Sequence, residues 1–585
     1  MIAILGISGL SNALSFKRSH WPGLDERDYR ISQGHDAAAA LIVDGRIVAA
    51  AAEERFNRLK HSGAFPAKAA AFCLSEAGMR VEDLAEIAHS FNYAPYEEIY
   101  SLDPVSRKLY HEVLSKDALL CQVKGFAPEF PLDQVHQVKH HLSHAASACF
   151  ASGWDECLTV VVDAMGETQG TSIFHARNGD LRRLGEISAN DSIGILYSLV
   201  TLHLGFDFNS DEYKIMGLAP YGDPSRYQKI FADMVEYRDR GALRIPILRI
   251  NRTRDERENY LKTREWLDAK LIPSREPDSE ITQAHRDVAA ALQACLNRTV
   301  MHVCSDYAER SGLRKLAMAG GVALNCTANG LLMRSGLFDE IFVQPAAGDD
   351  GAALGAALFR ASLRGPLESR RMPTPFLGPC YDRTAIEAAL ADFSDRVTLQ
   401  RFDDFTELTR VAAERIRQGQ VIGWYRGRME FGPRALGNRS ILADPGHPEM
   451  RQRINAMVKM REAFRPFAPA VSIEQVDRWF EVPPGTELPF MIATAMVRPQ
   501  YRATLPAVTH VDGSARVQTV AREDNREFHQ LLRAVGALTG CEMVLNTSFN
   551  VKGQPIVNTP REAIETFLGT GIDCLFLGDF LVTRS

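Results

Sequence analysis

The sequence lacks the cysteine pairs that zinc ribbons and disulfide scaffolds use. Its ten cysteines are scattered, mostly in apolar segments, and none forms a C-x-x-C pair. Single cysteines in apolar segments are usually reduced and buried. We therefore expect neither disulfides nor a zinc ribbon.

Long apolar runs are also absent. No stretch of about eighteen apolar residues occurs, which is the length that a membrane-spanning helix needs. The chain opens on an apolar strand, residues 1–7, with neither a basic stretch before it nor a cleavage site after it. We predict a cytoplasmic protein with no membrane partner.

An excess of positive charge is missing too. The formal net charge is -6 and the pI is near 6.3. A nucleic-acid partner requires a basic surface, so we expect none, although a local basic pocket for a small anion remains open. With 585 residues, 45% hydrophobic and 24% charged, the composition is that of an ordinary soluble protein.

Two histidines four positions apart are the first candidate for chemistry. The alanine-rich stretch 142–149 predicts a helix, which places His140 and His144 one turn apart on one face, where they can bind one metal ion. His141 points elsewhere. The alternative is chance, because the chain has sixteen histidines.

Two acids that follow predicted strands would complete a metal site. Asp163 ends the apolar run 157–162, and Asp349 follows the short strand around 342–344. Open α/β sheets bind ligands at the carboxyl ends of such strands. For Asp349 alone, an acid in the first turn of a helix is the simpler interpretation.

The first half of the chain repeats one pattern of strands. Strand 2–7 precedes a hairpin over 37–51, and strand 158–162 precedes a hairpin over 171–187. This repetition predicts two lobes of like topology that clamp a nucleotide between glycine turns. The candidate turns contain Gly166 in the second lobe and Gly320, Gly321 and Asn325 after the predicted helix 281–311.

A Pro- and Gly-rich segment, 363–379, predicts a domain boundary. Beyond it, the pattern of apolar residues predicts an amphipathic helix over 404–417. Residues 426–440 then contain four arginines between glycine and proline bends, a spacing that suits a small dianion such as a phosphate. We expect Arg434 to bind the anion and Arg426, Arg451 and Arg453 to form surface salt bridges.

Several motifs together resemble the carbamoyltransferases of the NodU/CmcH type. The matching stretches are His35-Asp36, Glu53-Glu54-Arg55-Phe56, the run 140–145, residues 211–219, the turn 320–325 and the arginine-rich loop. The resemblance covers nearly the whole chain. It implies an α/β fold: a two-lobed, actin-like ATPase domain similar to TsaD over 1–363, a linker over 364–380, and an α+β domain similar to YrdC over 381–585.

The same resemblance implies a set of site residues. The metal ligands would be His140, His144, Asp163 and Asp349, and a mixed His/carboxylate set fits iron while zinc, manganese or magnesium stay open. Carbamoyl phosphate would bind to Arg434, Lys459, Arg465, Arg516 and Ser548.

Two further residues are candidates for catalysis. His35 is the candidate base for an acceptor hydroxyl, with an ordinary loop histidine as the alternative, and Lys60 is a candidate phosphate contact. The long polar segment 11–34 before His35 predicts a loop that lines the acceptor pocket.

These expectations combine into an ATP-dependent O-carbamoyltransferase. It would turn carbamoyl phosphate and ATP into carbamoyl-adenylate in the C-terminal domain and transfer the carbamoyl group to a hydroxyl of a small, natural product-like acceptor in the N-terminal domain. Assembly as a homodimer is a further expectation. The rivals are a tRNA-modifying enzyme of the threonylcarbamoyl-adenosine type and a metal-dependent peptidase, which lacks the Glu of H-E-x-x-H after His140.

Overall fold

The computed structural model describes residues 1–585 except 368–371, 373, 460–461 and 463. The chain forms two compact units, which we call unit 1 (residues 1–57 and 61–373) and unit 2 (residues 58–60 and 374–585). The change from unit 1 to unit 2 falls inside the segment predicted as a linker. Each unit has its own sheets.

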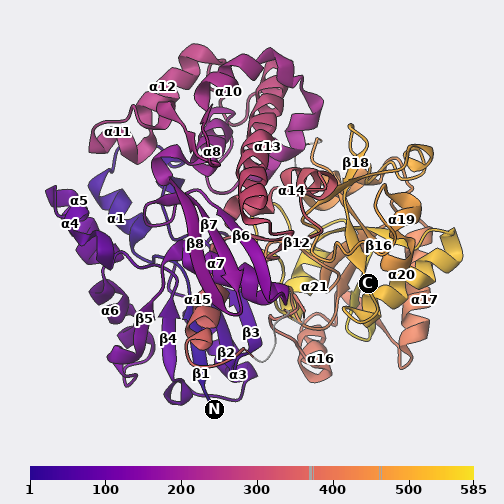
Figure 1. The fold of residues 1–585 in the computed structure, drawn as a ribbon. Coiled ribbons are helices and arrows are strands. Elements are labelled where there is room, and N and C mark those ends of the chain that lie inside the picture. The colour runs from indigo at the N-terminus through magenta and orange to yellow at the C-terminus, as the bar shows by residue number, and fades with distance from the viewer. Residues whose placement is uncertain (368–371, 373, 460–461, 463) are drawn as a thin grey trace. The chain divides into compact units, whose positions relative to one another are not determined.

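The first lobe of unit 1 is built on a five-stranded sheet with the order β3-β2-β1-β4-β5 (Figure 1). β1 is antiparallel to β2 and parallel to β4, which is parallel to β5. The strands are β1 (Ala3–Ile7), β2 (Ala38–Val43), β3 (Arg46–Ala52), β4 (Glu86–His89) and β5 (Val135–Gln137). The predicted hairpin over 37–51 is present as β2 and β3, and Asp44 and Gly45 between them both have positive φ, as a two-residue turn of this kind requires.

The second lobe repeats this connectivity in the order β12-β11-β6-β7-β8. β6 is antiparallel to β7 and parallel to β11, which is parallel to β12. The strands are β6 (Glu156–Val162), β7 (Gln169–Arg177), β8 (Asp180–Ser188), β11 (Lys315–Ala319) and β12 (Glu340–Val343). The prediction of two lobes with like topology is confirmed.

The two lobes exchange helices. Helix α7 (His140–Ser152) follows β5 of the first lobe but packs on β6 and β11 of the second. Helix α15 (Asp349–Ser362) follows β12 of the second lobe but packs on β1 and β2 of the first. The two helices also pack against each other, so the start of each is fixed by both sheets.

Small residues allow this close packing. A Cβ on Gly355 of α15 would lie 1.7 Å from the carbonyl oxygen of Ser143 in α7, and a Cβ on Gly6 of β1 would lie 2.0 Å from the carbonyl oxygen of Ala353. Neither site can hold a side chain unless the backbones move apart, because real Cβ atoms do not approach so closely.

The remaining helices of unit 1 surround these lobes. The long helix α13 (Gln283–Ser311) agrees with the predicted 281–311 and packs on α8, α9, α10 and α14. The others are α2 (Glu54–Asn57), α3 (Ala67–Glu76), α4 (Glu97–Tyr100), α5 (Pro104–Leu109), α6 (Lys116–Phe126), α8 (Ile193–His203), α9 (Glu212–Leu218), α10 (Gln228–Met234), α11 (Arg254–Asn259), α12 (Leu261–Lys270) and α14 (Cys326–Arg334). The short strands β9 (Glu236–Tyr237) and β10 (Leu243–Arg244) form a ribbon.

The prediction that residues 11–34 form one long loop is wrong. The segment contains helix α1 (Ala13–His20) and a 3-10 turn at Asp28–Arg30. Lys17 can be buried because its Nζ donates hydrogen bonds to three carbonyl oxygens. These belong to Asp28, Ile31 and Glu258, at 2.9, 2.6 and 2.7 Å. A lysine satisfied in this way supports compact structure where its polarity alone had suggested a loop.

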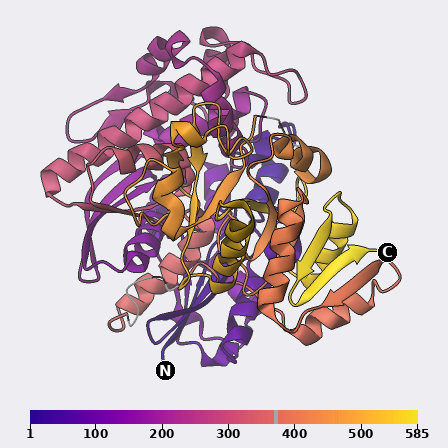
Figure 2. The ribbon, with the colours of Figure 1, turned by 90° about the vertical axis from the view of Figure 1, so that its right-hand side faces the viewer.

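Unit 2 contains an eight-stranded mixed sheet with the order β13-β22-β21-β14-β15-β20-β16-β19 (Figure 2). Its strands are β13 (Val397–Arg401), β14 (Ile422–Tyr425), β15 (Arg439–Ala443), β16 (Ala468–Ser472), β19 (Gln518–Val520), β20 (Met543–Ser548), β21 (Cys574–Leu577) and β22 (Phe580–Arg584). A separate ribbon joins β17 (Thr494–Met496) to β18 (Ser514–Arg516).

Helices α17 and α20 pack together and share an apolar core with this sheet. The expected amphipathic helix over 404–417 is confirmed as α17, and the Asp404 side chain caps it by accepting from the backbone N–H of Thr406. The helices of unit 2 are α16 (Arg383–Ala391), α17 (Phe405–Arg417), α18 (Met450–Ile454), α19 (Val476–Trp479), α20 (Arg526–Thr539) and α21 (Pro560–Leu568).

All ten cysteines are free thiols, and seven of them are buried, as the composition predicts. Among the described residues, no helix combines the length and apolar character needed to cross a membrane.

Because α7 and α15 meet at Gly355, Gly355→Ala should destabilise unit 1 by about 1–3 kcal/mol, the usual cost of overpacking. The matched control is Gly125→Ala on the exposed face of α6, where a Cβ meets nothing within 4 Å and helix propensity favours alanine. Urea unfolding of the two variants measures the difference. Equal unfolding midpoints would contradict the close helix contact.

Candidate metal centre and anion-binding edge

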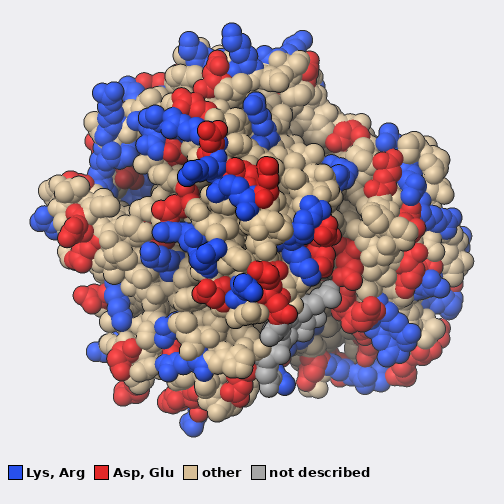
Figure 3. Space-filling model, viewed as in Figure 1, with Lys and Arg blue, Asp and Glu red and all other residues tan. Residues whose placement is uncertain are grey.

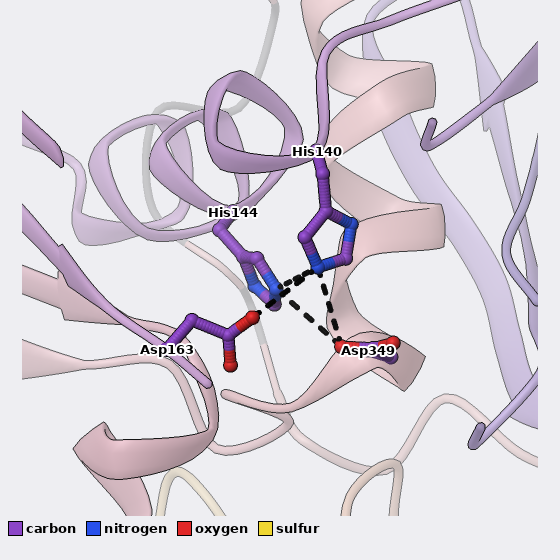
Figure 4. A group of neighbouring side chains, drawn as sticks. All are labelled: His140, His144, Asp163 and Asp349. Carbon is purple, nitrogen blue, oxygen red and sulfur yellow. Dashed lines mark hydrogen bonds and ion pairs between the residues drawn. The ribbon is translucent and has the colours of Figure 1, made fainter. Parts of the chain in front are cut away.

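Four side chains from three places in unit 1 converge on one point (Figure 4). His140 and His144 lie in the first two turns of α7, Asp163 follows β6, and Asp349 is the first residue of α15. One ligand atom from each residue can be chosen so that all four lie within 4.8 Å of one another. The structure therefore brings together the four residues that the sequence analysis proposed as metal ligands.

The spacing of the donor atoms fits a single ion. Nε2 of His140 is 3.1 Å from Nε2 of His144, 3.5 Å from Oδ2 of Asp163 and 3.4 Å from Oδ1 of Asp349. The Asp349 oxygen is 3.7 Å from Nε2 of His144. Ligands about 2.1 Å from an ion are separated by roughly 3.0 Å in an octahedron and 3.4 Å in a tetrahedron. The cluster can accept a divalent cation with little movement.

The imidazole of His140 is oriented by the end of β4. Its Nδ1 donates a hydrogen bond to the carbonyl oxygen of Ser90 at 3.2 Å, and its ring stacks on Phe91 at 4.0 Å. This contact leaves Nε2 as the nitrogen that faces the other ligands, which is how a carbonyl bonded to the far nitrogen usually orients a metal-binding histidine. His144 Nδ1 is buried and has no hydrogen-bond partner within the described part of the chain.

Glu167 ties two parts of this centre together. Its Oε1 accepts hydrogen bonds from the backbone N–H groups of His140 at 2.8 Å and Asn92 at 2.9 Å. The carboxylate thus joins the start of α7 to the segment that holds the His140 ring. Glu167 was not predicted from the sequence, because nothing in the chain marks an acid four positions after Asp163 as a partner of α7.

Asp163 is held by the glycine turn after β11. Its Oδ1 accepts a hydrogen bond from the backbone N–H of Gly321 at 2.9 Å. Gly320 has a φ of 92°, and a Cβ there would lie 2.3 Å from the carbonyl oxygen of Val162. Gly320 also donates its N–H to Ala347, just before Asp349. The double glycine therefore packs the ends of three parallel strands together.

The carboxylates control the charge of His140. Burial alone lowers the pKa of this histidine, but Asp349 and Asp163 outweigh burial and raise the pKa well above its ordinary value. Burial raises the pKa of Asp349, and His140 reverses the effect and brings it to about 2. The pKa of Asp163 is lowered as well, with His140 and His144 outweighing its burial. A cation would replace the proton of His140 in the same field of negative charge.

His141 points away from the cluster, as predicted. Its Nδ1 is 2.8 Å from Oγ of Ser172, and burial lowers its pKa to about 3. A Cβ on Gly166 would lie 3.0 Å from its Nε2. The glycine proposed as a nucleotide contact therefore also makes room for this ring.

Asn325, also proposed as a nucleotide contact, has its side chain fully engaged within unit 1. Its Oδ1 caps α14 by accepting from the backbone N–H of Ala328 and also accepts from Gln293, while its Nδ2 donates to the Gln293 side-chain oxygen. These bonds fix the turn that carries Gly320 and Gly321.

His35 lies within electrostatic range of Asp349, one of the four residues of the centre. His35 Nε2 is 3.0 Å from Oγ of Ser32, and burial lowers its pKa, with Asp36 and Asp349 among the groups that raise it. Lys60 is exposed and belongs to unit 2 by contact.

An acid–histidine pair that was not predicted from the sequence lies beside His35. Asp36 Oδ1 and His61 Nδ1 are 2.8 Å apart. Both residues have positive φ, which is unusual for residues with side chains and is commonest at functional sites.

In unit 2, strand polarity gathers the proposed carbamoyl phosphate contacts. Tyr425 of β14 pairs with Arg439 of β15, and Ser440 pairs with Ser548 of β20. On one side of the sheet, β14, β20 and β21 therefore end where β15, β16, β19 and β22 begin. We call this line of strand ends, with the arginines in the loops beside it, the basic edge.

Each proposed residue belongs to a segment that reaches this edge. Arg434 lies in the loop before β15, and Arg465 lies in the loop before β16. Arg516 is the last residue of β18, just before β19 begins, and Ser548 is the last residue of β20. Arg434, Arg465, Arg516 and Ser548 are all half-buried. The side chain of Lys459, which also precedes β16, lies outside the described residues.

A buried acid shapes the arginine-rich loop. Oε1 of Glu430 accepts hydrogen bonds from the backbone N–H groups of Leu436, Asn438 and Arg439 at 2.8, 2.9 and 3.1 Å. Arg426 was expected in a surface salt bridge, and its pairing with Glu527 is present, but its side chain is only 10% exposed. Arg426 is buried because it follows the end of β14, where it also donates a hydrogen bond to the carbonyl oxygen of Gly578.

Comparison with known proteins places this geometry in a family. The family models Carbamoyltransferase N-terminus and Carbamoyltransferase C-terminus match residues 30–358 and 413–584. The nodulation protein NolNO of Sinorhizobium fredii is 41% identical over 94% of this chain and 79% of its own length. Nodulation protein U of Bradyrhizobium diazoefficiens is 27% identical over 89% of this chain and 91% of its own. A 3'-hydroxymethylcephem-O-carbamoyltransferase of Amycolatopsis lactamdurans is 35% identical over 46% of this chain and 49% of its own.

The structure is an α/β protein of two units. Unit 1 contains a His/Asp cluster of the kind that binds a cation, and unit 2 carries the basic edge. The family matches add the particular class. The chain belongs to the carbamoyltransferase family and is a transferase enzyme.

If the four residues bind a cation, His144→Ala should lower the affinity of the protein for that cation by more than about tenfold. Changing a residue that only hydrogen-bonds to a metal ligand already has an effect of about that size, and His144 would be a ligand itself. His175→Ala is the control, since His175 lies on β7 and pairs with Glu156. Titration with Fe²⁺ or Zn²⁺ and elemental analysis measure the affinity. Equal metal content in both variants would refute the ligand assignment.

The raised pKa of His140 predicts the pH dependence of stability in chelator-treated protein. The stabilisation from the charged imidazole is complete below the unfolded pKa of about 6.5 and is lost as the pH rises through the higher folded pKa. Melting temperatures of the chelated wild type should therefore fall relative to His140→Gln above about pH 6.5. If the melting temperatures of the two proteins changed equally with pH across that range, the ion pairing would be contradicted.

Proposed function

We propose that the protein is an ATP-dependent O-carbamoyltransferase with two separate steps. Unit 2 converts carbamoyl phosphate and ATP into carbamoyl-adenylate, and unit 1 transfers the carbamoyl group to a hydroxyl of a small, natural product-like acceptor. The proposal rests on one observation: the two candidate sites belong to different units, with the His₂Asp₂ cluster in unit 1 and the basic edge in unit 2.

The basic edge suits the first step. Carbamoyl phosphate and the phosphates of ATP are anions that guanidinium groups bind in a bidentate manner. Arg434, Arg465, Arg516 and the Ser548 hydroxyl, with Lys459, would hold these phosphates. Water cleaves carbamoyl phosphate to carbamate and phosphate, and a carbamate oxygen then bonds to the α-phosphorus of ATP as the bond to pyrophosphate breaks, which gives carbamoyl-adenylate. Because the product is an acyl phosphate that water attacks, a second site in the same protein limits its loss.

The second step needs a base and a polarised carbonyl. His35 is the proposed base, since the lowering of its pKa by burial keeps the ring neutral and able to accept a proton. The acceptor hydroxyl gives its proton to His35, its oxygen bonds to the carbamoyl carbon, and the bond from that carbon to the AMP oxygen breaks. A divalent cation held by His140, His144, Asp163 and Asp349, for which iron is our choice, would polarise the carbamoyl oxygen.

Gly166, Gly320 and Gly321 are proposed to approach the nucleotide portion in unit 1, where turns without side chains let backbone groups contact phosphate. Lys60 remains a proposed phosphate contact.

The relatives support an O-linked product. One is by name a 3'-hydroxymethylcephem-O-carbamoyltransferase, and others are nodulation proteins. A tRNA substrate fits less well, because lysine and arginine are interspersed with acidic residues on the face in Figure 3 and the net charge is negative. A peptidase fits less well because His141 occupies the place of the catalytic glutamate in H-E-x-x-H.

Variants in the two units should separate the steps. Arg434→Ala should slow pyrophosphate release from ATP and carbamoyl phosphate about ten- to a hundredfold, the effect of losing a charged hydrogen bond to phosphate. His140→Ala should still release pyrophosphate but form no carbamoylated acceptor.

Rescue provides the control for this prediction. Added carbamoyl-adenylate should restore product formation in Arg434→Ala and not in His140→Ala. Measurement combines a pyrophosphate assay with mass detection of a carbamoyl gain on a panel of hydroxyl-bearing acceptors. The opposite rescue pattern would show that the steps are assigned to the wrong units.

A further inference from the structure

His35, the proposed base, lies in the connection between β1 and β2. We call residues 30–35 of this connection the base loop. The side-chain amide of Asn209 donates hydrogen bonds to the carbonyl oxygens of Arg30 and Ser32, at 3.3 and 3.0 Å. The Ser32 hydroxyl in turn lies 3.0 Å from Nε2 of His35. The orientation of the imidazole therefore depends on how the base loop is held.

Gln33 reaches from the base loop to the second lobe. Its Nε2 donates hydrogen bonds to the carbonyl oxygens of Met165 and Gly166, both at 2.8 Å, and its Oε1 accepts one from the hydroxyl of Tyr93. Met165 and Gly166 lie between β6 and β7, the second-lobe counterparts of β1 and β2. One half-buried side chain thus joins equivalent connections of the two lobes.

The turn that Gln33 contacts also carries the candidate metal ligand Asp163. Two backbone hydrogen bonds close this turn: the N–H of Asp163 donates to Gly170 at 2.9 Å, and the N–H of Gly166 donates to Gln169 at 2.7 Å. A turn closed twice in this way moves as one piece. A contact with its middle therefore fixes the base loop relative to Asp163.

Tyr93 orients the amide of Gln33 from a position beside the candidate metal centre. Its ring stacks on Phe91, which stacks on the ring of His140. Burial raises the pKa of Tyr93 well above its ordinary value, and the charge of Asp349 is among the groups that raise it further. The hydroxyl therefore stays protonated and donates to Oε1 of Gln33, which leaves the amide nitrogen facing the two carbonyl oxygens.

We propose that Gln33 sets the position of the His35 base relative to the candidate metal centre. The inference rests on the proposed function, in which His35 takes the proton of the acceptor hydroxyl beside that centre. Gln33 is a positioning residue, because it acts through the loop that carries the base. Displacing a reacting group by about 1 Å can slow a reaction roughly a hundredfold, and the two hydrogen bonds to the second lobe oppose such a displacement.

Gln33→Glu tests this role with a side chain of the same size. A carboxylate cannot donate to the carbonyl oxygens of Met165 and Gly166, and they repel it. With added carbamoyl-adenylate, kcat for transfer should fall about ten- to a hundredfold while the KM for the acceptor stays within about twofold. Pyrophosphate release in the first turnover and metal content should not change. Gln283→Glu is the matched control, because Gln283 is exposed at the start of α13 and also donates to a carbonyl oxygen, that of Tyr221.

Two further variants show whether Gln33 acts through His35. In a His35→Gln background, Gln33→Glu should change the rate of transfer by less than about twofold, because the base that it positions is gone. Tyr93→Phe keeps the ring on Phe91 and removes the hydroxyl that orients the amide. It should lower kcat for transfer about two- to tenfold, the effect of one neutral hydrogen bond. Independent losses from Gln33→Glu and His35→Gln would overturn the inference.

Amide hydrogen exchange tests the contact without turnover. In Gln33→Glu, peptides that cover 30–36 and 163–168 should exchange faster than in the wild type and in Gln283→Glu. Unchanged exchange in these peptides, loss of metal from Gln33→Glu, or equal falls in transfer and pyrophosphate release would overturn the inference. If the wild type transfers no carbamoyl group from carbamoyl-adenylate, the proposed function fails, while exchange still decides whether Gln33 holds the base loop to the second lobe.

Discussion

The contact between α7 and α15 is the constraint on which the architecture of unit 1 depends. Each helix leaves one lobe and packs on the sheet of the other, and Gly355 lets their backbones meet where a methyl group would collide with Ser143. Since α7 begins with His140 and α15 begins with Asp349, the packing that joins the lobes also fixes the candidate metal ligands. The geometry of the cluster is thus a consequence of the core, and the charged groups contribute orientation through Ser90 and Glu167.

Unit 2 reaches a comparable result by strand polarity. Parallel and antiparallel neighbours alternate so that residues far apart in the sequence end at one edge, including the arginine-rich loop, Arg516 and Ser548. Glu430 then bends the loop by accepting three backbone hydrogen bonds with one oxygen. A buried carboxylate inside a basic loop has a structural purpose here, because those N–H groups would otherwise lack partners in the interior.

The two sites differ in how they manage charge. In the His₂Asp₂ cluster, two carboxylates face two imidazoles, and the raised pKa of His140 reflects a local excess of negative charge that a cation would balance. At the strand ends beside Tyr425, the guanidinium groups of Arg426 and Arg383 pair with carboxylates of unit 2. The first arrangement attracts a cation, and the second is already neutralised by its own ion pairs. Neither difference follows from net charge, which is an average over the whole chain.

Local sequence patterns predicted the duplicated hairpins, the long helix α13, the amphipathic helix α17 and the His140/His144 pair, because strand alternation, turn residues and helical spacing are properties of neighbours in the chain. Local patterns wrongly predicted one long loop at 11–34, where the buried Lys17 donates hydrogen bonds to three carbonyl groups, one of them from the distant Glu258. They also gave no sign that Glu167 holds α7, that Asp36 pairs with His61, or that Arg426 is buried against Glu527. The sequence by itself determined the elements and the donor types; the tertiary structure alone decided which distant groups meet, because those contacts depend on helix exchange and strand order rather than on any local spacing.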